Sequence, residues 1–108
     1  MLETVEGFDY QIHWNPSKAA SNLRKHGISF DAAATVFLDP MARTIADSDH
    51  DDLEERWITM GFTGGGVVLV VVHTWQDRSQ NSARVRIISA RHPTGWELKL
   101  YEDNLGAK

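Results

Sequence analysis

The chain of 108 residues has no cysteine. A disulfide framework and a thiolate zinc site are therefore excluded, and packing alone must hold the fold together, as suits a reducing cytoplasm. A secretory signal is also missing, because the N-terminal residues include acids where such a signal carries bases, and no apolar stretch follows them. The longest apolar run, Val67 to Val72, is too short to cross a bilayer. We expect a cytoplasmic protein with no membrane partner.

Basic residues are fewer than acidic residues in this chain. The chain has 11 lysines and arginines against 15 aspartates and glutamates, so its net charge is -4, which argues against binding nucleic acid through average charge. The charges are unevenly distributed, however. Six acids lie between residues 47 and 55, whereas four arginines lie between residues 78 and 91: Arg78, Arg84, Arg86 and Arg91. The sequence therefore predicts a small local basic patch and no broad basic face.

Size and composition indicate one folded unit. Hydrophobic residues make up 42% and charged residues 24% of the chain, which is close to the average of globular proteins and unlike disordered chains. A chain of 12.2 kDa is long enough to bury one continuous core. We expect residues 1–108 to form a single domain.

The first part of the chain predicts one strand and two helices. Residues 10–14 alternate apolar and polar, as in a half-buried strand. Asn15–Pro16 suits the start of a helix that runs to residue 25 or 26, and Gly27 stops it. Ser29 is the predicted cap of a second helix, which ends at Pro40. The second helix has an apolar stripe at helical spacing, formed by Phe30, Ala33, Ala34 and Phe37.

The remainder of the chain predicts mainly strands. They cover residues 42–46, 56–62, 67–72 and 83–90, and a glycine-rich hairpin at residues 63–66 joins the second to the third. A last helix begins near Thr94 and has two apolar stripes. The predicted fold class is α+β: a small curved antiparallel sheet with two N-terminal helices and one C-terminal helix, all on one face.

The last predicted strand carries the most informative basic residues. Because side chains alternate along a strand, we expect Arg86 on the face of Ala90 and Arg91 on the opposite face. Arg86 precedes two isoleucines inside the sheet, where a guanidinium needs a partner. A phosphate and a salt bridge to Glu55 or Glu97 are equally good partners for it. Arg91 lies near the first amides of the next helix, which favour anions.

Two glutamates have competing interpretations. Adjacent strand residues point to opposite faces, so only one of Glu55 and Arg56 can face a given site. We assign Arg56 to phosphate and Glu55 to structure. Thr94 and Glu97 have the spacing of a capping box, which favours a helix cap over a catalytic role for Glu97.

Two histidines are candidates for proton transfer. His26 falls at the apolar edge of the first helix, where a packed histidine is more common than a catalyst, although its pKa suits an acid or a base. His73 ends the buried central strand, where packing and functional roles are equally open. His13 and His50 carry no distinguishing signal.

No metal site or nucleotide cofactor is predicted. The aspartate-rich run at residues 47–52 would need glycine at Asp52 and glutamate at Ile58 to form an EF-hand, so we interpret the run as a solvated turn. The glycines at residues 64–66 join two strands and do not open a helix, as a phosphate-binding loop would.

Several short motifs occur in a specific order along the chain. They are Trp14-Asn15-Pro16-x-Lys18-Ala19, Asn22-x-x-Lys25-His26-Gly27-Ile28-Ser29-Phe30, Val36-Phe37-x-Asp39-Pro40, Glu54-Glu55-Arg56-Trp57 with Gly61, His73-Thr74-Trp75, and Arg86-Ile87-Ile88-Ser89-Ala90-Arg91 followed by Glu97 and Tyr101. Each motif is weak alone, but the ordered series resembles the BrnT family of ribonuclease toxins from Phe8 to Glu102.

The resemblance implies a RelE-like fold and a metal-independent endoribonuclease that inhibits translation as the toxin of a type II toxin–antitoxin system. It also implies neutralisation by a BrnA-like antitoxin with a ribbon-helix-helix segment, and contact with operator DNA only through that antitoxin. After Arg91 this chain has fewer basic residues than the family often shows, which predicts a thinner phosphate-binding surface.

RNA transesterification needs a base, an acid and cations beside the phosphate. Guided by the resemblance, we predict a catalytic set of His26, Arg56, His73, Arg86, Arg91, Glu97 and Tyr101. The predicted RNA-binding residues are Lys25, Arg86 and Arg91. Two alternatives stay open: a non-catalytic module that binds a protein or RNA, and, more weakly, a metal-dependent nuclease that uses the aspartate run.

Overall fold

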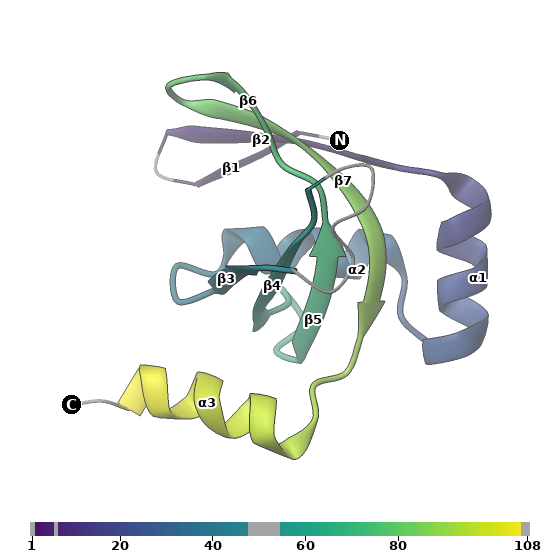
Figure 1. The fold of residues 1–108 in the computed structure, drawn as a ribbon, viewed down its shortest axis with the longest axis vertical. Helices are drawn as coiled ribbons and strands as arrows, with labels where there is room; N and C mark the ends of the chain where they lie inside the picture. The colour runs from purple at the N-terminus through teal and green to yellow at the C-terminus, as the bar shows by residue number, and fades with distance from the viewer. Residues whose placement is uncertain (1, 6, 48–54, 107–108) are drawn as a thin grey trace.

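A computed structural model describes residues 2–5, 7–47 and 55–106 of the chain, and it has helices and strands in the α+β combination that the sequence predicts (Figure 1). The elements are β1 (Leu2–Val5), β2 (Phe8–Trp14), α1 (Pro16–His26), α2 (Phe30–Ala34), the 3-10 helix η1 (Thr35–Leu38), β3 (Arg43–Ala46), β4 (Trp57–Phe62), β5 (Val68–His73), β6 (Gln76–Ser79), β7 (Ser82–Arg91) and α3 (Gly95–Gly106).

The strands form one mixed sheet. Six of them follow the order β1-β2-β7-β5-β4-β3. The seventh strand, β6, pairs with the first residues of β7, on the opposite edge from β2. β2 pairs with β7 in parallel, with Ile12 opposite Val85, so the prediction of an antiparallel sheet is wrong for this pair. Hairpin turns reveal only the pairing of neighbouring strands, whereas β2 and β7 are distant in sequence. The short strands β1 and β6 were not predicted either.

Local capping explains where α1 begins and ends. The Asn15 side chain accepts hydrogen bonds from the amides of Ser17 (2.8 Å) and Lys18 (3.3 Å), and Pro16 occupies the first helical position. Gly27 adopts a left-handed conformation (φ 70°) and its amide donates to the Leu23 carbonyl. These contacts confirm both predicted ends of the helix.

The second predicted helix is divided in two. The Ser29 hydroxyl caps it by accepting from the Ala32 amide at 3.1 Å, but the α-helical part ends at Ala34 and continues as η1. The predicted stripe is confirmed, because Phe30, Ala33, Ala34 and Phe37 are all buried.

The two faces of the sheet have different coverings. Leu69 and Val71 belong to the core with residues of α2 and η1, and we call this side the helical face. Val70 points the other way and lines a pocket with Leu100 and Tyr101 of α3, and we call this side the open face. Figure 1 shows α3 apart from α1 and α2. The expectation that all helices lie on one face is therefore wrong.

A β-bulge interrupts the alternation of β7. His73 of β5 pairs with Ile87, but the preceding Val72 pairs with Ser89, so Ile88 is an extra residue. Ile87 and Ala90 consequently both face the core, and Arg91 pairs with Val70 on the open face. The prediction that Arg86 and Arg91 lie on opposite faces of the sheet is therefore wrong, because both lie on the open face.

Candidate phosphate-binding site

Three cationic side chains from separate parts of the chain line one small pocket. Lys18 comes from the first turn of α1, Arg56 directly precedes β4, and Arg86 lies in β7. The pocket has a volume of about 100 Å³ and is completed by Asn15, Ile87 and Ile88. No carboxylate from the described part of the chain lines it. We call it the cationic pocket.

The N-terminus of α1 adds to the positive potential. Asn15 is the cap of this helix, and no acidic residue lies in its first turn. The first amides and the helix dipole favour an anion at this end. The cationic pocket thus combines side-chain cations with a helix N-terminus, a suitable environment for a phosphate group.

Backbone contacts fix the two arginines. The Arg56 carbonyl accepts from the Asp47 amide at 2.9 Å, while the Arg56 Nε atom is buried without a hydrogen-bond partner among the described residues. The Arg86 amide donates to the Thr74 hydroxyl at 3.1 Å, and the Arg86 carbonyl accepts from the Thr74 amide at 3.0 Å. A buried guanidinium N–H without an acceptor is costly, and a phosphate oxygen would satisfy it.

His13 lies beside this pocket, although the sequence did not single it out. It is opposite Arg86 in the parallel register of β2 and β7, and its Nε2 atom accepts from Arg84 Nε at 3.2 Å. Burial and the charges of Arg84 and Arg86 lower the pKa of His13, so the imidazole is neutral at neutral pH. Only knowledge of the β2–β7 pairing could have revealed this position.

Arg91 and Glu97 form a separate site at the start of α3. Two guanidinium nitrogens of Arg91 donate to the two Glu97 oxygens at 2.8 and 2.9 Å. Glu97 also accepts from the Thr94 amide, and its own amide donates to the Thr94 hydroxyl, which confirms the predicted capping box. The hydrogen bonds from Arg91 lower the pKa of Glu97 to about 2.

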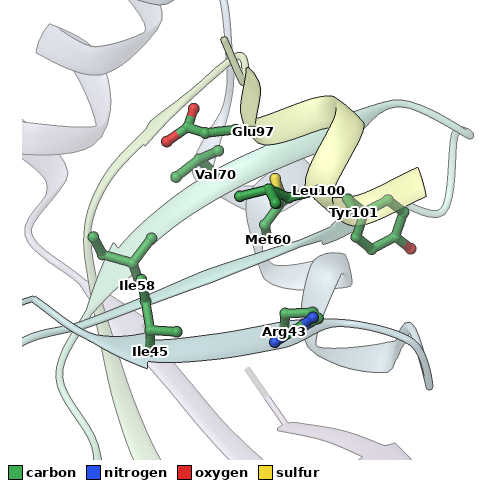
Figure 2. Close-up of a pocket in the computed structure, with 8 residues that line it drawn as sticks. All are labelled: Arg43, Ile45, Ile58, Met60, Val70, Glu97, Leu100 and Tyr101. Carbon is green, nitrogen blue, oxygen red and sulfur yellow. The ribbon is translucent and has the colours of Figure 1, made fainter. Parts of the chain in front are cut away.

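Glu97 and Tyr101 both line an apolar pocket of about 190 Å³ between α3 and the open face, as Figure 2 shows. Tyr101 is fully buried, packs edge-on against Phe62, and donates its hydroxyl proton to Asp39. Burial and the Asp39 carboxylate raise the pKa of Tyr101. Its phenol is therefore engaged in a structural contact.

His73 is buried in the core. Its Nδ1 atom is 2.9 Å from the Thr74 carbonyl and its Nε2 atom is 2.7 Å from the Thr59 hydroxyl. Burial lowers its pKa to about 4, so it is neutral at neutral pH. No part of its side chain is exposed to a substrate in solution.

Lys25 and His26 lie at the other end of α1 from the cationic pocket. Both are exposed. His26 is eight residues from Lys18, which corresponds to roughly 12 Å along the helix axis. Of the predicted site residues, the structure thus brings Arg56 and Arg86 together, pairs Arg91 with Glu97, and leaves Lys25, His26, His73 and Tyr101 elsewhere.

The remaining sequence features give no second site of this kind. Residues 48–54, which contain most of the aspartate run and the first glutamate of the Glu54-Glu55 motif, lie outside the described residues. Within the described ranges, no three metal-ligating side chains come together, and no helix is long and apolar enough to span a membrane.

Comparisons with known proteins agree with the resemblance in sequence. The family model described as "Ribonuclease toxin, BrnT, of type II toxin-antitoxin system" matches residues 14–97. The solved structure of the Brucella abortus ribonuclease toxin BrnT is similar in fold, with a TM-score of 0.54 and 18% sequence identity over 79% of this chain and 97% of that chain. No curated protein matches the sequence.

Proposed function

The chain belongs to the BrnT family of ribonuclease toxins of type II toxin–antitoxin systems, and from this premise we propose that it is an endoribonuclease that binds the scissile phosphate in the cationic pocket. The observation that carries the proposal is the convergence of Lys18, Arg56 and Arg86 on one pocket at a helix N-terminus. The buried Nε atom of Arg56 offers a donor that a phosphate oxygen would satisfy.

The chemistry that suits this pocket is attack of a ribose 2′-oxygen on the adjacent phosphorus with departure of the 5′-oxygen. Negative charge builds up on the phosphate oxygens in the transition state. Planar guanidinium groups can hold two such oxygens at once, which favours Arg56 and Arg86 in this role. The proposed reaction is metal-independent, since these cations supply the charge stabilisation.

Two further residues are suited to the proton transfers. His13 is neutral and lies opposite Arg86, so we assign it the removal of the 2′-hydroxyl proton, which its Nε2 atom accepts in exchange for the hydrogen bond from Arg84. The Lys18 ammonium lies in the pocket and can protonate the leaving 5′-oxygen. His13 takes this role in place of the predicted candidates His26 and His73, because His26 lies at the far end of α1 and His73 is buried.

Membership of a type II system implies an antitoxin partner and an RNA substrate. Within that system we propose the finer roles that the resemblance implies: inhibition of translation in the cytoplasm, neutralisation by a BrnA-like ribbon-helix-helix antitoxin, and contact with operator DNA through the antitoxin. A RelE-like relationship of the fold stays a prediction.

Digestion of RNA by the purified chain, with and without EDTA, tests the activity. We expect cleavage that EDTA does not diminish. Arg56→Gln should slow cleavage about 100-fold, in the range typical for loss of one transition-state donor. Arg24→Gln is the matched control, because it makes the same change at an exposed arginine in the last turn of α1 and should leave the rate unchanged.

Different outcomes separate the competing functions. Loss of cleavage in EDTA would favour the metal-dependent alternative. RNA binding without cleavage would favour the non-catalytic module. Equal rates for Arg56→Gln and Arg24→Gln would remove the cationic pocket from the mechanism.

A further inference from the structure

A second pocket on the helical face differs from the cationic one in chemistry and size. Its volume is about 400 Å³, within the range of roughly 300–1,000 Å³ that is usual for small-molecule sites. Its walls include four aromatic side chains: Phe8, Tyr10, Phe37 and Trp75. We call it the aromatic pocket.

The aromatic rings are held in defined orientations. Trp75 Nε1 donates to the Asp77 carboxylate at 2.9 Å, which fixes the indole. The Phe8 ring is stacked near Trp75 with an interplanar angle of 25°, and Tyr10 meets Trp75 edge-on at 77°. Preset aromatic surfaces of this kind bind flat nucleic-acid bases by stacking.

The polar part of the pocket presents hydrogen-bond acceptors, and a chain of hydrogen bonds determines this. A carbonyl oxygen can only accept, so His73 Nδ1 donates to Thr74, and the Nε2 atom of the neutral ring is an acceptor. The Thr59 hydroxyl therefore donates to Nε2 at 2.7 Å. Thr44 must then donate to Thr59, also at 2.7 Å, which leaves the Thr44 oxygen as an acceptor in the pocket.

Asp39 supplies a second acceptor at the same pocket. Its Oδ2 atom accepts from the Phe62 amide and the Tyr101 hydroxyl, while Oδ1 accepts, among the described residues, only from the Met41 amide. A carboxylate has about four acceptor positions, so Oδ1 keeps one for a ligand. Burial opposes ionisation, but these hydrogen bonds outweigh it and lower the pKa of Asp39, so the group is charged at neutral pH.

We propose that the aromatic pocket binds a guanine base of the RNA. The inference rests on the proposed ribonuclease function for its class of ligand. Guanine fits because its pairing edge carries two adjacent donors, the ring N–H and the 2-amino group, which match the two acceptors of Thr44 and Asp39. The pairing edges of adenine and cytosine place an acceptor beside their amino group.

The aromatic pocket and the cationic pocket meet at one chain segment. Trp75 directly follows Thr74, whose amide and hydroxyl are both hydrogen-bonded to the backbone of Arg86. A base stacked on Trp75 is therefore connected, through this segment, to the strand that carries the phosphate-binding arginine. The aromatic pocket lies on the helical face and Arg86 on the open face, so this segment joins the two sites through the sheet.

Calorimetric titration of the purified chain with GMP and AMP tests the proposal, because the two ligands have the same phosphate and differ only in the base. We expect GMP to bind about tenfold more tightly than AMP, as for one good bidentate base contact. Thr44→Val removes the acceptor and should bring the two affinities close together. Thr44→Ser keeps the hydroxyl and should retain the preference.

Controls make the result independent of folding and of cleavage. Ile45→Val alters the neighbouring residue on the other face of β3 and should retain the GMP preference, and circular dichroism verifies that each variant folds. Equal GMP and AMP affinities, no binding of either, or an unchanged preference in Thr44→Val would overturn the inference even if RNA is cleaved. A GMP preference without cleavage would instead contradict the proposed function alone.

Discussion

Arg86 and Arg91 lie on the same strand and the same face of the sheet, yet their surroundings differ completely. Arg86 shares its pocket with two further cations and the N-terminus of α1. Arg91 is held by both oxygens of Glu97, which is fixed in turn by the cap of α3. Arg86 lies among further cations beside a helix N-terminus, whereas Arg91 is bound by a carboxylate of the protein.

The difference shows that an arginine in a strand is not by itself a phosphate site. The neighbouring charges decide whether the guanidinium binds a ligand or joins two elements of the fold. Arg91 connects the end of β7 to the start of α3, so it supports the position of that helix. Arg86 is the residue that we expect to contact RNA.

The largest expected effect separates the two arginines in catalysis. Arg86→Ala should slow RNA cleavage by about 100- to 1,000-fold, because the transition state loses a preorganised donor. Arg91→Ala should change the rate by less than about threefold, since its charge is already used by Glu97. Single-turnover cleavage of a short RNA measures both. Comparable losses of cleavage rate in Arg86→Ala and Arg91→Ala would contradict the proposed difference in role between the two arginines.

A smaller effect should appear in stability. The pKa of Glu97 in the folded chain, about 2, is below its ordinary value of 4.5, so the ion pair contributes stability above about pH 4.5 and loses it as pH falls towards 2. Both side chains are partly exposed, which limits the contribution to about 1 kcal/mol. Urea denaturation should therefore show Glu97→Gln less stable than wild type at neutral pH, with the gap narrowing in acid. A gap that does not depend on pH would point to lost packing.

The smallest expected effect is in the salt dependence of RNA binding. Arg86→Ala should reduce the slope of log affinity against log salt by about one unit, since one phosphate contact is removed. Arg91→Ala should leave the slope unchanged. Fluorescence anisotropy with an RNA that carries 2′-deoxyribose at the cleaved position avoids turnover. A reduced slope for Arg91→Ala would show that Arg91 contacts phosphate after all.

Local signals in the sequence predicted local structure well. Asn15–Pro16 and Gly27 gave the ends of α1 because capping depends only on nearby residues. Thr94 and Glu97 predicted the capping box for the same reason. The sequence could not reveal that Arg91 would be the partner of Glu97, because that depends on the angle between β7 and α3.

The site was harder to predict because it depends on pairing between distant strands. The parallel pairing of β2 with β7 brings His13 to Arg86, and no turn motif encodes it. The sequence shows Lys18 only as a member of the motif that begins at Trp14, although its place in the first turn of α1 puts it in the cationic pocket. Strand alternation allows only one of Glu55 and Arg56 to face a given site, and in the structure Arg56 lines the same pocket.

The extra residue in β7 has a consequence for the length of this strand. Ile88 shifts the phase of the strand, so that residues separated by five positions share a face. Removing Ile88 would leave Ile87, Ser89, Ala90 and Arg91 in regular alternation opposite their present partners in β5, so Arg91 would stay on the open face. The open face of both arginines is therefore compatible with a strand one residue shorter, and deletion of Ile88 should leave the Arg91–Glu97 ion pair in place.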